Sequence, residues 1–207
     1  MQPLPDAVDA GGLPLNTVRA SNNIDTKSVL GDMKGRVHAM AQLHEWLYRS
    51  RTLASIDLGS YLGRLATQVF QTQGVNGGLV RLNLDMGSVQ VGMDQATVGG
   101  LLLNELITNC IKHGFPEGRS GEVSVTLQPA ALGQESDAKW CLSVSDTGIG
   151  LSADFEESRK TSLGMQLVGD LTIQLGGTLA IDSMPDKGVK FSVVFTALEP
   201  APLVMPA

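Results

Sequence analysis

One predicted helix, over about residues 95 to 113, carries residue types that bind phosphates and metal ions. Glu105, Asn109, Lys112 and His113 recur at intervals of three and four, which places them on one helix face over two turns. An amide oxygen can ligate Mg2+, an ammonium group can neutralise phosphate charge, and a carboxylate can orient or deprotonate a group. The solvated face of an ordinary amphipathic helix would look the same, so this helix alone leaves both interpretations open.

A second set of residues follows a predicted strand over Lys139 to Ser145. Asp146 would project from the end of that strand, and Gly148 and Gly150 would let the next turn approach a ligand closely. A buried carboxylate at this position can accept a hydrogen bond from the exocyclic amine of adenine. Because Asp-Thr-Gly is also ordinary turn chemistry, a simple Asx-turn is the alternative.

A third set lies at the start of a helix predicted over about 163 to 175. The sequence there is Ser162-Leu163-Gly164-Met165. Backbone N–H groups and the positive end of the helix dipole at such a position can bind phosphate oxygens. A glycine that simply begins a helix explains the same residues equally well.

The elements that must position these residues alternate irregularly between helix and strand. A helical pattern begins at Asp25, and a second helix runs from an N-cap at Ile56-Asp57 to a break at Gly74. Hydrophobic residues then recur with the period of two that is typical of strands. Strands are predicted over residues 80–84, 89–91, 122–128, 139–145, 178–181 and 189–195, and a helix with Asp94 as its N-cap over 95–113.

This order of elements predicts an α/β fold, a two-layer sandwich in which a mixed sheet carries helices on one face. A helical segment precedes the sandwich. The expected boundaries are a flexible leader over 1–24, the helical region over 25–74, the α/β domain over 77–197 and a disordered tail over 198–207.

Composition excludes several classes of protein. Lys and Arg number 15 against 21 Asp and Glu, without a basic block, so we expect no nucleic-acid partner. No run of about 18 apolar residues occurs and the N-terminus lacks a signal pattern, so we expect no membrane contact and a cytoplasmic location. Cys110 and Cys141 are interpreted as small buried residues rather than as a disulfide or a metal site.

The three motifs, in this order, resemble a known family. Residues 104–116, 146–151 and 162–168 are similar to the ATP-binding domain of sensor histidine kinases, within the gyrase, chaperone, kinase and mismatch-repair ATPase superfamily. Upstream, residues 36–50 resemble the second helix of the dimerisation and phosphotransfer region in the subgroup whose motif reads His-Arg-x-Lys-Asn. The resemblance spans about residues 25–196.

The resemblance implies an ATP-dependent protein-histidine kinase that acts in a two-component system. ATP and Mg2+ would be its cofactors, a response regulator receiver domain its partner, and the 25–74 helices a possible homodimer contact. Leu151 to Thr161 would form a short ATP lid that is expected to be mobile until nucleotide binds. In the nucleotide pocket that the resemblance implies, Asn109 would ligate Mg2+ and Asp146 would read adenine. The phosphates would be faced by Glu105, Lys112 and His113. The nucleotide would be lined by Gly148, Gly150, Ser162, Leu163, Gly164 and Met165.

Two departures from the family pattern leave a second function open. The acceptor motif is missing: its nearest match, Val18 to Asn23, has valine where the histidine belongs, so the acceptor helix either lies outside this sequence or is lost. We interpret His44 as a buried structural residue and His38 as a surface residue. Val189 stands where the family commonly has threonine, which is expected to weaken ATP binding. The alternative is therefore a kinase-like phosphotransfer or scaffold protein with a non-catalytic nucleotide domain.

Overall fold

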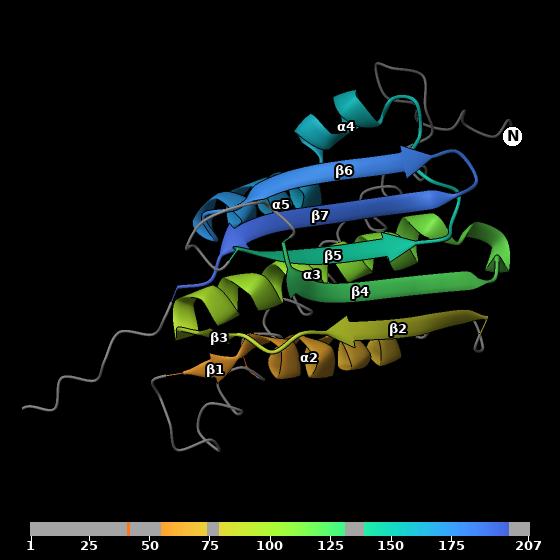
Figure 1. The fold of residues 1–207 in the computed structure, drawn as a ribbon. Coiled ribbons are helices and arrows are strands. Elements are labelled where there is room, and N and C mark those ends of the chain that lie inside the picture. The colour runs from red at the N-terminus through yellow and green to blue at the C-terminus, as the bar shows by residue number, and fades with distance from the viewer. Residues whose placement is uncertain (1–40, 42–54, 74–78, 131–138, 199–207) are drawn as a thin grey trace, which may run out of the picture. The chain divides into compact units, whose positions relative to one another are not determined.

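In the computed structural model, five strands form a mixed sheet whose order is β2-β4-β5-β7-β6 (Figure 1). The structure describes Ala41 and residues 55–73, 79–130 and 139–198. The predicted leader, the helix from Asp25, His38, His44 and residues 199–207 of the predicted tail lie outside these described residues. The strands are β2 (Val80–Met86), β4 (Gly121–Pro129), β5 (Lys139–Asp146), β6 (Thr178–Met184) and β7 (Gly188–Thr196).

The sheet is mixed because one strand pair is parallel. β2 runs parallel to β4, and helix α3 (Met93–Gly114) lies between them in the chain, as a crossover requires. β4 and β5 pair antiparallel, β7 pairs antiparallel with both β5 and β6, and β6 forms the edge. A separate short pair joins β1 (Ile56–Asp57) to β3 (Gln90–Val91). The predicted two-layer α/β sandwich is confirmed.

Alternation along the strands determines which face of the sheet receives the helices. Val123, Val125 and Leu127 point to one side of β4 and are fully buried, whereas the residues between them are not. The helices α2 (Leu58–Thr72), α3 and α5 (Leu163–Gln174) cover that side (Figure 1). Leu102, Leu103, Leu106 and Ile107 of α3 are fully buried, so α3 is the central helix of the core.

Helix α2 belongs to the same core. Its N-cap is Asp57, as predicted, whose side chain accepts a hydrogen bond from the Ser60 N–H at 2.9 Å. Leu58, Leu62 and Leu65 are buried against α3 and the sheet. One of the two helices that the sequence assigned to the 25–74 region therefore completes the sandwich. The predicted boundary at residue 77 stays a prediction.

Two local predictions are wrong. Helix α3 begins at Met93 with Gly92 as its N-cap, and Asp94 lies inside the first turn, where a carboxylate still favours the helix dipole. The segment Leu151 to Thr161, expected as an ATP lid without regular structure, contains a helix, α4 (Phe155–Thr161). Of the helices in the described ranges, none is long and apolar enough to cross a membrane.

Candidate nucleotide-binding site

A pocket of about 430 Å³ opens beside the C-terminal half of α3. Its volume falls within the range of small-molecule sites, about 300 to 1,000 Å³. Its walls come from α3, from the loop after β5, from α4, from the start of α5 and from β7. The lining residues are Asn109, His113, Gly114, Asp146, Ile149, Gly150, Leu151, Ser152, Phe155, Ser158, Arg159, Ser162, Met165, Val189 and Phe191.

Asp146 lies at the inner end of this pocket with one carboxylate oxygen unused. It is the last residue of β5, and only 5% of it is exposed. Its Oδ1 accepts a hydrogen bond from the Gly148 N–H at 2.8 Å. Its Oδ2 is buried and accepts no hydrogen bond of regular geometry within the described residues, although the Cys110 thiol and the Val189 N–H lie close enough to the carboxylate to lower its pKa. A buried acceptor without a donor costs free energy, so this atom calls for a ligand that donates a hydrogen bond.

The surroundings of Asp146 are apolar enough to change its acidity. Burial raises the pKa of the Asp146 carboxyl, and the hydrogen bond from Gly148 opposes that shift. Beneath it, Cys110 of α3 is 1% exposed, and burial together with the Asp146 charge raises the pKa of the Cys110 thiol. Cys110 is therefore a neutral buried residue, as predicted, and it adds no competing charge to the pocket.

The loop after β5 is pressed against two other backbone segments, which explains its glycines. A Cβ added at Gly148 would lie 2.2 Å from the carbonyl oxygen of Gly114 at the end of α3. Gly150 has φ +79°, and a Cβ there would lie 2.6 Å from the carbonyl oxygen of Met184. The Ile149 N–H donates to the Gly114 carbonyl at 3.0 Å. This contact holds the loop against the end of α3.

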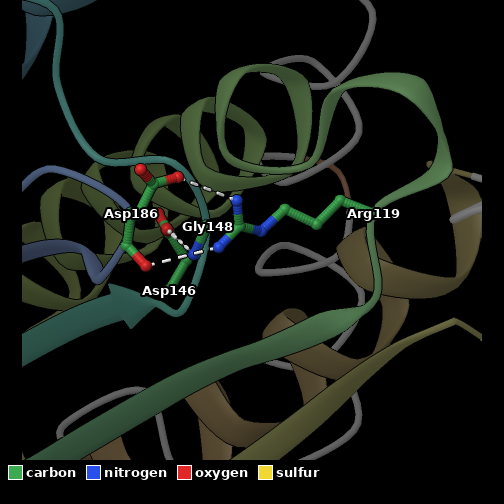
Figure 2. Close-up of polar contacts among 4 residues, drawn as sticks. All are labelled: Arg119, Asp146, Gly148 and Asp186. Atoms are coloured by element: carbon green, nitrogen blue, oxygen red, sulfur yellow. Dashed lines mark hydrogen bonds and ion pairs between the residues drawn. The ribbon is translucent and has the colours of Figure 1, made fainter.

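An ion pair joins the loop after α3 to the turn between β6 and β7, next to Asp146. Arg119 Nη1 lies 3.1 Å from Asp186 Oδ1, and Nη2 donates to the Asp186 carbonyl at 3.3 Å (Figure 2). Asp186 in turn donates its N–H to the Ile149 carbonyl at 2.9 Å. The three loops at this end of the pocket are therefore connected to one another.

This ion pair is expected to contribute little to stability. The Arg119 and Asp186 side chains are 35% and 81% exposed, so water screens the attraction between them. Asp186→Asn should lower the free energy of unfolding by less than about 1 kcal/mol, because asparagine also tolerates the positive φ of 58° at this residue. Urea denaturation measures the change. A loss of several kcal/mol would show that the pair holds the loops together.

The other end of the pocket brings α3 and the start of α5 together. Glu105 is 4% exposed, and a Cβ added at Gly164 would lie 3.7 Å from Glu105 Oε2 and 3.8 Å from Asn109 Oδ1. Asn109 Nδ2 donates to the Met165 sulfur at 3.7 Å. Ser162 is the N-cap of α5, but its side chain makes no cap hydrogen bond. The first backbone N–H groups of α5 are thus available to an anion.

The solvated-face interpretation of α3 is wrong for three polar residues of its C-terminal half. Asn104, Glu105 and Thr108 are 4%, 4% and 6% exposed, because α2 and α5 flank α3 on its two sides. Asn104 Nδ2 lies 3.5 Å from Glu105 Oε1, and Thr108 Oγ1 accepts from Gln73 Nε2 at 3.4 Å. Buried polar residues with these contacts either belong to a binding site or support the residues that form it.

The remaining predicted residues divide into two groups. Asn109, His113, Asp146, Gly150, Ser162 and Met165 line the pocket. Lys112 is exposed and does not line the pocket. The other predicted residues outside the lining are Gly148, Leu163 and Gly164. Of these, Gly148 and Gly164 still shape the pocket through the contacts described above. The predicted roles of all these residues stay predictions.

Sequence reasoning missed the contribution of α4. Phe155, Ser158 and Arg159 line the pocket from this helix. A signal was present, because Glu156 and Glu157 occupy the first turn and Arg159 and Lys160 the last, which is the charge order that favours a helix. The glycine-rich and polar surroundings of the segment hid that signal.

Two family models match the sequence. The model described as "Histidine kinase-, DNA gyrase B-, and HSP90-like ATPase" matches residues 95–199, and the model described as "Histidine kinase" matches residues 13–73. Among curated proteins, Blue-light-activated histidine kinase 2 of Erythrobacter litoralis is 31% identical over 61% of this chain and 34% of its own length. Sensor histidine kinase PdtaS of Mycobacterium tuberculosis is 28% identical over 82% of this chain and 33% of its own length.

Solved structures show the same fold. The histidine kinase domain of a blue-light-activated histidine kinase from Erythrobacter litoralis superposes with a TM-score of 0.70 at 24% identity, covering 88% of each chain. The chain spans about a third of the length of the curated relatives that it matches. The ATPase model covers the pocket and all three motifs around it. This chain therefore belongs to the family of histidine kinase-, DNA gyrase B- and HSP90-like ATPases.

Proposed function

We propose that this chain is the ATP-dependent core of a protein-histidine kinase in a two-component system. The observation that carries the proposal is the unpaired Asp146 Oδ2, buried at one end of a pocket whose other end is the N-terminus of α5. A ligand that donates a hydrogen bond at one end and carries negative charge at the other satisfies both ends. An adenine nucleotide has this chemistry.

Each end of the pocket has a distinct role in the proposal. Asp146 Oδ2 accepts a hydrogen bond from the adenine amine, while Gly148 holds the other oxygen. The phosphates extend toward Asn109 and the first turn of α5, where backbone N–H groups and the helix dipole stabilise negative charge. His113 lies at the exposed rim, and we assign Lys112, which is exposed next to it on α3, to the outer phosphates. We assign to Glu105 the orientation of the attacking group, because its Oε2 faces the start of α5, 3.7 Å from a Cβ placed at Gly164.

The residues fit a magnesium ion that is held mainly by the nucleotide. Within the described ranges, no group of three His, Cys, Asp or Glu residues could hold a metal ion. Mg2+ usually keeps several waters and takes only one or two protein ligands beside phosphate oxygens, and Asn109 can supply one amide oxygen. When it is bound, the ion would neutralise part of the negative charge of the phosphates.

The proposed reaction moves the γ-phosphoryl group of ATP to a histidine and then to an aspartate of a response regulator receiver domain. The bond between the γ-phosphorus and the bridging oxygen breaks, a phosphorus–nitrogen bond to the acceptor imidazole forms, and ADP leaves. Positioning and charge stabilisation by the pocket residues would supply most of the catalysis. We further propose a homodimer through the 25–74 helices and a cytoplasmic location, where ATP is supplied.

Asn109→Asp tests the metal role. The substitution keeps the side-chain size but adds negative charge beside the phosphates, so phosphoryl transfer should fall on the order of 100-fold. The measurement is transfer of label from ATP to a supplied acceptor domain by the full chain. Binding of adenosine, which carries no phosphate, should be unchanged and controls for folding. An unchanged transfer rate would show that Asn109 does not act on the metal or the phosphates.

Val189 favours the non-catalytic alternative. It is 8% exposed and lines the pocket, so an apolar side chain stands where the resemblance expects a hydroxyl near adenine. If ATP binds but no label reaches a supplied acceptor domain, the chain is better described as a phosphotransfer or scaffold module. Transfer to that acceptor supports the kinase.

A further inference from the structure

The carboxylate of Asp146 lies against one face of helix α3. A Cβ added at Gly114 would lie 3.1 Å from both Cγ and Oδ1 of Asp146 and 3.4 Å from its Oδ2. Cys110 precedes Gly114 by four residues, so its side chain leaves α3 on the same face, one turn earlier. Cys110 is 1% exposed and does not line the pocket. Its thiol therefore approaches the carboxylate from the core of the domain and not from the pocket.

The Cys110 thiol keeps a proton that it can donate. Burial, the negative charge of Asp146 and the contact with its carboxylate all raise the pKa of this thiol, so it is neutral at physiological pH. Burial also raises the pKa of the Asp146 carboxyl, and three donors oppose that shift: the Gly148 N–H, the Cys110 thiol and the Val189 N–H. The thiol thus favours the ionised carboxylate, which is the form that only accepts hydrogen bonds.

The other two donors to this carboxylate are backbone groups. The Gly148 N–H holds Oδ1 at 2.8 Å, and Val189 contributes its N–H but has an apolar side chain. A Cβ added at Gly188 would lie 3.0 Å from Oδ1, so backbone packs closely on that side. An ionised carboxylate has about four lone-pair sites, and the hydrogen of a thiol can turn about the Cβ–Sγ bond. The thiol can therefore bind the carboxylate and still leave a lone pair of Oδ2 for a ligand.

We propose that Cys110 is a positioning residue for base recognition: one turn before Gly114, its S–H group donates to the Asp146 carboxylate and fixes the orientation in which Oδ2 accepts a hydrogen bond from the exocyclic amine. This inference rests on the proposed function, because it assumes that an adenine nucleotide occupies the pocket. Cys110 does not touch the nucleotide and acts through Asp146. Its removal should therefore weaken recognition of the amine and leave the contacts of the phosphates unchanged.

The test compares two triphosphates that differ only at the amine. The full chain and its Cys110→Ala variant are titrated by calorimetry with Mg-ATP and with the magnesium complex of purine riboside triphosphate, which lacks the amine. Loss of one hydrogen bond should weaken ATP binding about fivefold and leave the binding of purine riboside triphosphate unchanged. Cys110→Ser keeps a donor at this position, so its affinity for ATP should stay close to that of the wild type.

Cys141→Ala is the matched control. It makes the same substitution at the other cysteine, which lies on β5 and pairs with Gln128 on the face of the sheet away from the helices. Its Sγ lies 3.4 Å from Ser143 Oγ. The affinity of this variant for either triphosphate should equal that of the wild type.

A second measurement needs no nucleotide. Carboxyl carbon-13 NMR follows the pKa of the Asp146 carboxyl, and Cys110→Ala should raise this pKa because a donor to the charged form is removed. Cys110→Ser should bring it back toward the wild-type value. Every variant keeps the other charged and titratable side chains of the described pocket lining and of the adjacent ion pair: His113, Arg159, Arg119 and Asp186. A change that follows the donor therefore reports on the thiol.

Four results would overturn the inference. Equal losses for both triphosphates in Cys110→Ala would indicate that Cys110 only supports the fold of α3, and no loss for ATP would indicate that the carboxylate needs no support from the thiol. A Cys110→Ser variant as weak as Cys110→Ala would exclude the role of a donor. An Asp146 pKa that Cys110→Ala leaves unchanged would exclude the contact itself. A wild-type chain that binds neither triphosphate would instead overturn the proposed function, while the pKa measurement would still decide whether the thiol donates to Asp146.

Discussion

Replacing Asp146 with asparagine is expected to weaken ATP binding by roughly 10- to 100-fold, the value of a lost hydrogen bond to a charged group. The geometry makes asparagine a poor substitute. The Gly148 N–H, 2.8 Å from Oδ1, needs an acceptor, so the single amide oxygen of asparagine would remain there. The amide NH2 would then occupy the position of Oδ2 and face the adenine amine, donor against donor. Calorimetric titration with Mg-ATP measures the loss.

The same substitution should raise thermal stability at neutral pH. Burial raises the folded-state pKa of Asp146, so the folded protein binds this proton more tightly than the unfolded chain does. The stability that Asp146 contributes is therefore complete below its unfolded pKa, near 3.9, and is lost as the pH rises through the folded value. The melting temperature of Asp146→Asn should exceed that of the wild type at pH 7. The difference should shrink as the pH falls toward 4.

Asp186→Asn is the control for Asp146→Asn. It makes the same chemical change nearby, at a side chain that is 81% exposed. Asp186→Asn should not weaken ATP binding as Asp146→Asn does. Its melting temperature should also not show the pH-dependent gain over the wild type that is expected for Asp146→Asn. Unchanged ATP binding in Asp146→Asn would contradict the assignment of Asp146 to the base.

Gly148→Ala should destabilise the protein by about 3 kcal/mol, at the upper end of the cost of overpacking. The added Cβ would lie 2.2 Å from the Gly114 carbonyl oxygen and 2.6 Å from its carbonyl carbon. These neighbours are backbone atoms at the end of a buried helix, so they cannot move aside as a flexible side chain would. The loop must shift away from α3. Chemical denaturation measures the loss of stability, and ATP affinity should fall with it.

Gly169→Ala is the matched control, with the opposite sign. Gly169 lies inside α5, and a Cβ added there would meet nothing within 4 Å. Alanine in a helix interior is more favourable than glycine by about 0.8 to 1 kcal/mol, so this variant should be slightly more stable. A Gly148→Ala variant as stable as the wild type would show that the loop is not held against α3.

The fold could be predicted largely from periodicity. Val123, Val125 and Leu127 alternate strictly because one face of β4 meets the helices and the other does not, and Leu102, Leu103, Leu106 and Ile107 follow the helical period for the same reason. Strand order could not be obtained in this way. β5 pairs with β7 and β2 pairs with β4, and both pairings join segments that are distant in sequence.

The candidate site could be predicted where a residue type in a given motif points to one main function. It could be predicted less well where the burial of a side chain depends on how the helices pack. Asp146 and the glycines after it stand in an order that indicates a ligand site, and the structure places Asp146 and Gly150 in the lining of one pocket. The burial of Asn104 and Thr108 was not predictable, because it depends on α2 and α5 flanking α3. Arg159 was missed because its helix has few apolar residues, so hydrophobic periodicity gave no indication of it.

The central claim is that Asp146 Oδ2 reads the exocyclic amine of adenine. Titration of the wild-type chain with Mg-ATP and with Mg-GTP tests it most directly, because the two nucleotides share their phosphates and sugar and differ at this group. Guanine presents a carbonyl oxygen where adenine presents the amine, which would place an acceptor against the buried carboxylate. We expect ATP to bind at least about 100-fold more tightly than GTP. Equal affinities for ATP and GTP would contradict the account.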